Sequence, residues 1–207
     1  MASLGILILA GGEATRLPGK LLLPIHSGSG EDVPMLVRVL QNMRAPEPRE
    51  IVISGKSTFP PALDAQLDVP LVIDRWPGRG PLAGMLSAMA RMRSRYVFAV
   101  AGDAPNLSAA FANDLMVRAQ SGDEAVCPRH VRDGRIEPLA SVYDRLAFLR
   151  HGLPVLRSGR GSLRSVLDRM NVRYVAVEDQ EPFANINTPA DFEHVRREGP
   201  MNFPTPR

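Results

Sequence analysis

Four short apolar runs in the chain are each followed by residues that can bind a ligand or take part in a reaction: Gly11-Gly12, Ser54, Asp74 and Asp103. In an open α/β sheet, ligands bind beyond the carboxyl ends of the strands. If the four runs are neighbouring parallel strands, their ends meet at one edge of the sheet. The sequence therefore predicts one crevice lined by two glycines, a hydroxyl group and two carboxylates.

The loop from Gly11 to Lys20 has the composition of a phosphate-binding loop. Two glycines directly after a strand let main-chain amides approach a ligand closely, and successive amides in such a turn form an anion-binding concavity. Arg16 and Lys20 add positive charge to the same loop. On composition alone, a plain glycine-rich turn with solvated cations explains the segment equally well.

Two better-known glycine motifs do not fit the chain. The dinucleotide fingerprint requires Gly-x-Gly-x-x-Gly, a spacing that Gly11-Gly12 does not provide. The segment Gly55-Lys56-Ser57 resembles the end of a P-loop, but the first glycine of that motif would have to stand at position 50, which is Glu50. Lys56 is therefore interpreted as a surface residue.

Asp103 is the candidate magnesium ligand, because it follows the most hydrophobic run and is flanked by Gly102 and Pro105. Mg²⁺ takes one or two protein carboxylates and shares its other positions with phosphate oxygens and water. The alternative is an ordinary turn or capping aspartate. No pair among the four histidines has the spacing of helical metal ligands, and Gly-x-Ser-x-Gly is absent from the sequence.

Two further loops have compositions that suit ligand binding. Arg75–Met85 contains three glycines and two prolines and could close over a flat base through backbone groups. Asn185–Pro189 could donate amides to a phosphate. The alternatives are a connection that packs tightly through small residues, and an Asx-turn in which Thr188 caps the last helix.

The apolar pattern predicts alternating strands and helices. Strands are expected at Leu4–Leu9, Ile51–Ile53, Leu71–Ile73, Tyr96–Ala101, Ala125–Cys127, Leu139–Val142 and Val172–Val177. Helices are expected at Pro34–Met43, Pro81–Met92, Ser108 to about Gln120, Arg145–Arg150, Ser162–Met170 and from Pro189 onward. Strands that are continuously apolar indicate a mostly parallel sheet covered on both faces, which is a three-layer α/β fold.

Length and composition limit the classes of protein to which the chain could belong. A chain of 207 residues suits a single domain, expected over 1–198, with a disordered tail at 199–207. The single cysteine, Cys127, excludes an internal disulfide. The run Leu4–Ala10 is too short to span a membrane, and no basic segment precedes it, so a cytoplasmic protein is expected. The arginines are dispersed among acids without a basic aromatic stripe, which argues against nucleic acid as a partner.

Only two of the 25 basic residues are lysines, Lys20 and Lys56. Replacement of surface lysines by arginine in a GC-rich genome explains the arginines. It does not explain Lys20, which stands where a compact ammonium group would face phosphates. The net charge of +3 suits small polyanionic substrates.

Four segments together resemble the molybdenum cofactor guanylyltransferase (MobA) family of nucleotidyltransferases: Leu9-Ala10-Gly11-Gly12 with Arg16-Leu17 and Lys20, Gly80-Pro81-Leu82-Ala83-Gly84-Met85, Gly102-Asp103-Ala104-Pro105, and Asn185-Ile186-Asn187-Thr188-Pro189. The motifs follow the family's order and extend from residue 9 to 191. The first motif is shared with sugar-nucleotide and cytidylyl transferases, whereas the second and fourth point more narrowly to the MobA group.

The resemblance implies a nucleotide-diphospho-sugar transferase type of fold with a Rossmann-like nucleotide-binding half. It also implies an Mg²⁺-dependent transfer of GMP from GTP to molybdopterin with release of pyrophosphate. Proteins that deliver molybdopterin or receive the product are implied as partners. The residues that correspond to the family's motifs have implied roles: nucleotide binding by Leu9, Ala10, Gly11, Gly12, Arg16, Lys20, Ser54, Asp74 and Asp103, catalysis by Lys20 and Asp103, metal binding by Asp103, and contact with the acceptor by Asn185 and Asn187.

Three departures from the family pattern bear on base and pterin specificity. The segment Arg16–Lys20 is one residue shorter than the family's and lacks an aspartate before the lysine. Ser54 stands where the family often has asparagine, and His26–Asp32 has the composition of an insertion. A cytidylyltransferase for molybdopterin, a transferase for a sugar phosphate and a non-catalytic nucleotide-binding protein stay open as alternatives.

Overall fold

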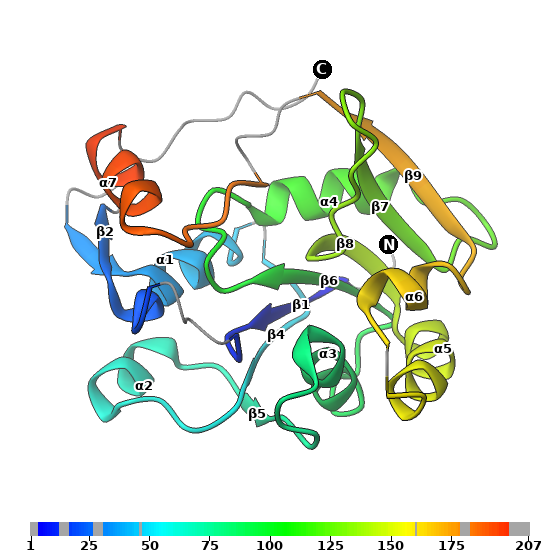
Figure 1. The fold of residues 1–207 in the computed structure, drawn as a ribbon, viewed down its shortest axis with the longest axis horizontal. Coiled ribbons are helices and arrows are strands. Elements are labelled where there is room, and N and C mark those ends of the chain that lie inside the picture. The colour runs from blue at the N-terminus through cyan, green and yellow to red at the C-terminus, as the bar shows by residue number, and fades with distance from the viewer. Residues whose placement is uncertain are drawn as a thin grey trace.

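A seven-stranded sheet lies at the centre of the structure, a computed structural model that describes residues 4–12, 17–26, 31–45, 47–159, 161–178 and 183–198 (Figure 1). The strands are β1 (Leu4–Leu9), β4 (Glu50–Gly55), β5 (Leu71–Ile73), β6 (Tyr96–Ala101), β7 (Ala125–His130), β8 (Ala140–Asp144) and β9 (Val172–Val177). Their order across the sheet is β5-β4-β1-β6-β8-β7-β9. Only β8 runs against its neighbours β6 and β7, so the prediction of a mostly parallel sheet is confirmed.

Helices cover both faces of this sheet. They are α1 (Met35–Asn42), α2 (Pro61–Leu67), α3 (Gly80–Met89), α4 (Ala109–Val117), α5 (Arg145–Arg157), α6 (Leu163–Leu167) and α7 (Pro189–Glu198). Side chains of α1, α2 and α4 join one apolar layer with Ile6 and Ile8 of β1, while α3, α5 and α6 join another with Leu7. Because successive residues of a strand point to opposite faces, a continuously apolar β1 is buried from both sides.

Local sequence explains where several helices begin. Ser108 Oγ accepts a hydrogen bond from the Phe111 amide at 3.3 Å, as expected for the cap of α4. Thr188 Oγ1 accepts from the Asp191 amide at 3.2 Å, which confirms Thr188 as the cap of α7. The helix predicted at Arg145–Arg150 is too short, because Asp144 caps α5 and the helix continues through Pro154 to Arg157.

Besides the short 3₁₀ helix Lys20–Leu22, three elements were not predicted. The short helix α2 begins at Pro61 and has too few residues for its periodicity to stand out. Strands β2 (Pro24–His26) and β3 (Asp32–Pro34) pair in an antiparallel hairpin, so the segment interpreted as an insertion is flanked by a two-stranded ribbon. The middle of that segment, 27–30, and the tail 199–207 lie outside the described residues.

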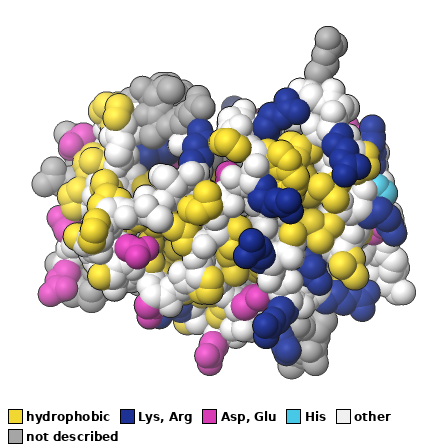
Figure 2. Space-filling view, turned by 90° about the horizontal axis from the view of Figure 1, so that it is seen from below, with side chains coloured by type: hydrophobic (Ala, Val, Ile, Leu, Met, Phe, Trp, Pro, Cys, Tyr) yellow, Lys and Arg dark blue, Asp and Glu magenta, His cyan; other side chains and the backbone are white. Residues whose placement is uncertain are grey.

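Charge is unevenly distributed on the face that carries α2, α3 and α5. Figure 2 shows this face from below, with Asp and Glu on the side of α2 and Lys and Arg, interspersed with hydrophobic side chains, on the side of α5. Among the residues that the structure describes, no helix has both the length and the apolar character needed to cross a membrane.

Strand register brings the predicted crevice residues to one edge. Leu9, the last residue of β1, pairs with Ser54 of β4 on one side and with Ala101 of β6 on the other. Ser54 in turn pairs with Val72 of β5. The chain segments that leave these four parallel strands therefore emerge side by side, on the side of the molecule where β2 and α7 lie (Figure 1).

Candidate functional site

A cleft of about 690 Å³ lies at this edge of the sheet. Its wall includes many of the residues singled out from the sequence: Leu9, Ala10, Gly11, Gly12, Lys20, Asp74, Asp103 and Asn185. They come from segments far apart in the chain, and the fold brings them together as the parallel-strand argument predicts. Arg16 lies outside the described residues.

The turn after β1 is held by two main-chain hydrogen bonds to neighbouring strands. The Ala10 amide donates to the Ser54 carbonyl at 2.7 Å, and the Gly102 amide donates to the Leu9 carbonyl at 2.9 Å. The Ala10 amide is therefore engaged by the sheet. Among the described residues of this turn, Gly11 and Gly12, which both lie in the cleft wall, are the candidates for main-chain donation to an anion.

Lys20 links three distant segments of the chain. Gly19 has a φ of 70°, which turns the chain into the short 3₁₀ helix Lys20–Leu22. The Lys20 ammonium group forms an ion pair with Asp103 and donates a hydrogen bond of 3.0 Å to Asn187 Oδ1. The shortened loop therefore does not remove Lys20 from the cleft.

The segment Asn185–Asn187 is fixed to the same site by its backbone. The Ile186 amide donates to the Asp103 carbonyl at 3.0 Å. The amides of Asn187 and Thr188 both donate to Asp191 Oδ2, at 2.9 and 2.8 Å. The start of α7 thus holds Asn187 against Lys20, although the two residues are 167 positions apart.

Asp74 lies at the opposite end of the cleft from Asp103, next to Ser54. The buried Ser54 Oγ donates to Asp74 Oδ1 at 2.5 Å, so the hydroxyl group orients the carboxylate and is not itself part of the cleft wall. Burial raises the pKa of the Asp74 carboxyl above its usual value, while the Ser54 hydrogen bond and the charge of Lys56 act in the opposite direction.

Two glycines permit this close packing. A Cβ atom at Gly84, in the first turn of α3, would lie 2.9 Å from Ser54 Oγ and 3.3 Å from Asp74 Oδ1. A Cβ atom at Gly11 would lie 3.2 Å from Asp74 Oδ2 and 3.5 Å from Lys56 Cγ. Any other residue at Gly84 would displace the Ser54–Asp74 pair.

Lys56 was interpreted as a surface residue, and its exposed side chain confirms this interpretation. It also lines the cleft beside Gly11, which was not predicted. Because Gly55-Lys56-Ser57 does not complete a P-loop motif, Lys56 was not predicted to lie in the site. Its place directly after β4, beside the strand that ends at Gly11, was the signal that could have identified it.

The chemistry of the donor set fits a magnesium ion that is shared with a ligand. In the described part of the chain, no group of three or more His, Cys, Asp or Glu side chains is arranged to hold a metal ion. Asp103 offers one carboxylate in the cleft, and Asn185 lies in the same wall. Mg²⁺ is commonly bound by one or two carboxylates together with phosphate oxygens and water, so one carboxylate is sufficient.

The sheet order, the glycine turn after β1 and the cleft at the strand ends define an α/β protein of the nucleotidyltransferase type. The model of the MobA-like NTP transferase domain matches residues 6–176. The chain therefore belongs to the MobA-like NTP transferase family.

Individual relatives agree with this assignment. A protein of Bacillus cereus strain B4264, named "Probable molybdenum cofactor guanylyltransferase", is 27% identical over 199 residues, which cover 93% of this chain and 95% of that protein. The crystal structure of molybdopterin-guanine dinucleotide biosynthesis protein A from Archaeoglobus fulgidus has a TM-score of 0.75 and 22% identity, over 94% of this chain and 97% of that one.

The fold extends beyond that group. The 2-C-methyl-D-erythritol 4-phosphate cytidylyltransferase from Thermus thermophilus has a TM-score of 0.67 at 13% identity, over 93% of this chain and 96% of that one. The nucleotide-diphospho-sugar transferase type of fold predicted from the sequence is therefore confirmed.

Proposed function

We propose that this protein transfers GMP from GTP to molybdopterin, with release of pyrophosphate, and so forms the guanine dinucleotide form of the molybdenum cofactor. The observation that carries the proposal is the assembly of Lys20, Asp103 and Asn187 beside the Gly11-Gly12 turn. The names of the relatives supply the two substrates.

The cleft can take a nucleoside triphosphate. The glycine turn offers amides to phosphate oxygens, and Lys20 supplies a positive charge that is largely shielded from water, because its side chain is only 13% exposed. A shielded cation stabilises phosphate charge more strongly than a solvated one. Asp74 and Gly84 line the part of the cleft in which the nucleoside would lie.

Catalysis would depend on position and charge. An oxygen of the acceptor phosphate bonds to the α-phosphorus, while the bond to the bridging oxygen breaks and pyrophosphate leaves with the electron pair. Lys20 would stabilise the charge that develops on pyrophosphate, and Asn185 and Asn187 would orient the acceptor. The attacking phosphate is already ionised, so no strong general base is needed.

Asp103 is the residue that would hold Mg²⁺. When bound, the ion would supply neutralisation of phosphate charge. Asp103 also anchors the Lys20 ammonium group, so the same carboxylate would position both cations of the site.

The test is pyrophosphate release with GTP and molybdopterin supplied together, with each substrate omitted in turn. Release that requires both substrates supports the proposal. The same assay with CTP addresses the nearest alternative, a cytidylyltransferase for molybdopterin. Turnover with CTP and none with GTP would replace the proposed nucleotide.

A further inference from the structure

The two lysines of the chain both line the cleft, from different strands. Lys56 directly follows β4, and Lys20 reaches Asp103, which follows β6. In the strand order, β4, which precedes Lys56, and β6, which precedes the Asp103 partner of Lys20, lie on opposite sides of β1. Each lysine has an aspartate in its neighbourhood: Asp103 for Lys20, and Asp74 for Lys56.

The two ends of the cleft differ in what surrounds the lysine. The Lys20 ammonium group contacts two polar side chains, Asp103 and Asn187, although Leu21 and Leu22 also line the cleft beside it. Near Lys56 the following residues Phe59 and Pro60 also line the cleft, and the Phe59 ring lies 3.7 Å from a Cβ atom placed at Gly55. Pro81 and Gly80 contribute to the wall as well. Apolar side chains with a few fixed polar groups suit a flat heterocycle better than a phosphate.

The charged groups of the cleft also favour a flat heterocycle at the Lys56 end and phosphate at the Lys20 end. A carboxylate repels phosphate, and Asp74 Oδ1 is held by the neutral hydroxyl group of Ser54, whereas Asp103 is paired with the Lys20 ammonium group. The Oδ2 atom of Asp74 faces Gly11 in the cleft wall. An oriented carboxylate accepts hydrogen bonds from N–H groups, which a nucleobase carries and a triphosphate does not.

We propose that Lys56 recognises the base of the nucleotide, with its ammonium group donating to an acceptor atom on the base edge while Asp74 accepts from an amino group of the same base. Guanine has both features, the O6 acceptor and the N2 amino group, whereas adenine has an amino donor in place of O6. The donor–acceptor pair Lys56–Asp74 therefore favours GTP over ATP. This inference rests on the proposed function only in assuming that the cleft takes a nucleoside triphosphate.

The exposed position of Lys56 allows its contribution to nucleotide binding to be tested by substitution. The side chain is exposed, so replacing it with an apolar chain of similar length leaves the packing around Gly11 in place. Lys56→Met is the test variant. Arg91→Met is the matched control, because Arg91 is an exposed cation at the far end of α3 and is absent from the cleft wall.

The measurement is the Kd of GTP, ATP and CTP with Mg²⁺ by calorimetry, for the wild type and both variants, with the melting temperature of each unliganded protein. We expect Lys56→Met to raise the Kd of the preferred nucleotide by about 10-fold or more, the usual cost of one charge-assisted hydrogen bond. The Kd of ATP should change less than about two-fold, and Arg91→Met should leave all three unchanged.

Other outcomes separate the inference from the proposed function. An equal loss of affinity for all three nucleotides would mean that Lys56 contacts phosphate, and no loss would mean that it makes no contact with the nucleotide; either result overturns the inference and leaves guanylyl transfer intact. A wild type that prefers CTP, with only CTP weakened in Lys56→Met, would replace GTP in the proposed function and keep Lys56 as the base contact. Absence of nucleotide binding in the wild type would overturn both.

Discussion

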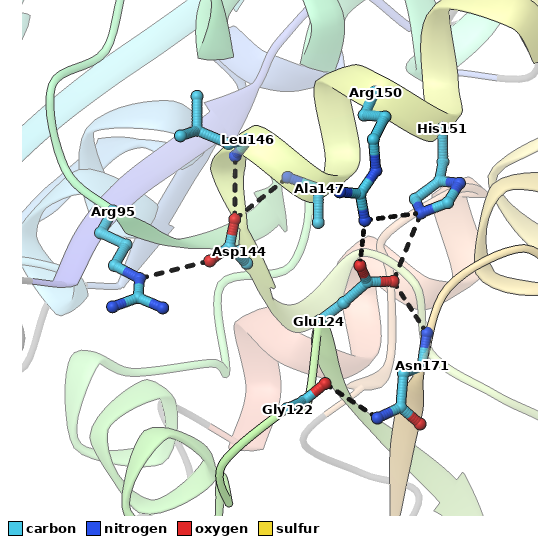
Figure 3. A network of polar contacts seen from close by, with 9 residues as sticks. All are labelled: Arg95, Gly122, Glu124, Asp144, Leu146, Ala147, Arg150, His151 and Asn171. Carbon is cyan, nitrogen blue, oxygen red and sulfur yellow. Dashed lines mark hydrogen bonds and ion pairs between the residues drawn. The ribbon is translucent and has the colours of Figure 1, made fainter.

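Charged side chains gather at both edges of the sheet, but they are arranged differently. At the carboxyl edge, Lys20 and Asp103 are nearly shielded from water, with side chains 13% and 12% exposed, and they line an open cleft. At the amino edge, Glu124 is the centre of a network with Arg150, His151 and Asn171 (Figure 3). The arginine in that network is 66% exposed.

The carboxylates of the Glu124 network are engaged by the backbone as well as by cations. Glu124 Oε2 accepts from the Asn171 amide at 3.0 Å, and Asp144 Oδ1 accepts from the amides of Leu146 and Ala147, both at 3.0 Å. In Figure 3 these bonds join the start of β7, the start of α5 and the segment before β9. The network therefore stabilises the junction of three elements.

The cleft acids are held so that part of each carboxylate faces the cleft. Ser54 fixes one oxygen of Asp74, and Lys20 contacts one oxygen of Asp103. Composition does not distinguish the two edges, since both contain acids beside arginine, lysine or histidine. At the amino edge, main-chain amides donate hydrogen bonds to the carboxylates, as at helix caps. At the carboxyl edge, the acidic side chains line an open cleft.

The largest expected effect comes from Asp103. Replacing it with asparagine removes the negative charge that holds Lys20 and, in the proposed function, Mg²⁺. We expect Asp103→Asn to lower turnover by at least about 100-fold, as the loss of a preorganised electrostatic group does elsewhere. Pyrophosphate release and the melting temperature are measured together, and near wild-type activity in a folded protein would exclude this role.

Lys20→Ala should have a comparable or slightly smaller effect, about 100-fold on turnover. The variant leaves Asp103 without its ion-pair partner but keeps the carboxylate available. Because the two side chains are in contact, their effects should not add. A double variant whose loss equals the product of the single losses would show that the two residues act independently.

The sequence was sufficient to predict the strands of the seven-stranded sheet and the crevice, since continuous apolar runs and the residues after them are local features; it did not show the hairpin of β2 and β3. Leu4–Leu9, Leu71–Ile73, Tyr96–Ala101 and Val172–Val177 have the predicted bounds. The reversed direction of β8 could not be predicted, because direction depends on which strands pair and not on the composition of the strand.

The site was predicted less completely for a similar reason. Residue types identified Lys20 and Asp103, but the contact of Lys20 with Asn187 depends on where α7 begins. Ser54 was expected to bind the nucleotide, which stays a prediction; the sequence did not show that its buried side chain donates to Asp74. The place of Lys56 in the cleft wall depends on the neighbours of β4 in the sheet, which no local motif shows.

Ser54→Ala tests the orientation of Asp74 through pH. Burial raises the pKa of Asp74 and the Ser54 hydrogen bond lowers it, so removal of the hydroxyl should raise the pKa further. If nucleotide binding needs the ionised Asp74 carboxylate, acidification should abolish binding at a higher pH in Ser54→Ala than in the wild type. We expect the Kd to rise by about five- to ten-fold near neutral pH, the cost of one hydrogen bond.

The control for this prediction is Asp74→Asn, which should weaken binding and remove the acidic limb of the Kd–pH profile altogether. Lys56, whose charge also lowers the pKa of Asp74, is left in place in both variants. An acidic limb that is identical in the wild type and in Ser54→Ala would contradict the orienting role of Ser54.

The smallest effect on activity is expected at the amino edge. Glu124→Gln leaves a single oxygen to accept from the Asn171 amide or the Arg150 guanidinium group, because the new amide nitrogen only donates, and it removes the negative charge of the side chain. Exposed ion pairs contribute little, so the free energy of unfolding should fall by about 1 kcal/mol and turnover should stay within about two-fold of the wild type. Chemical denaturation and pyrophosphate release measure the two quantities. A large loss of turnover with unchanged stability would mean that the two edges are coupled, and that the Glu124 network serves more than the junction of β7, α5 and β9.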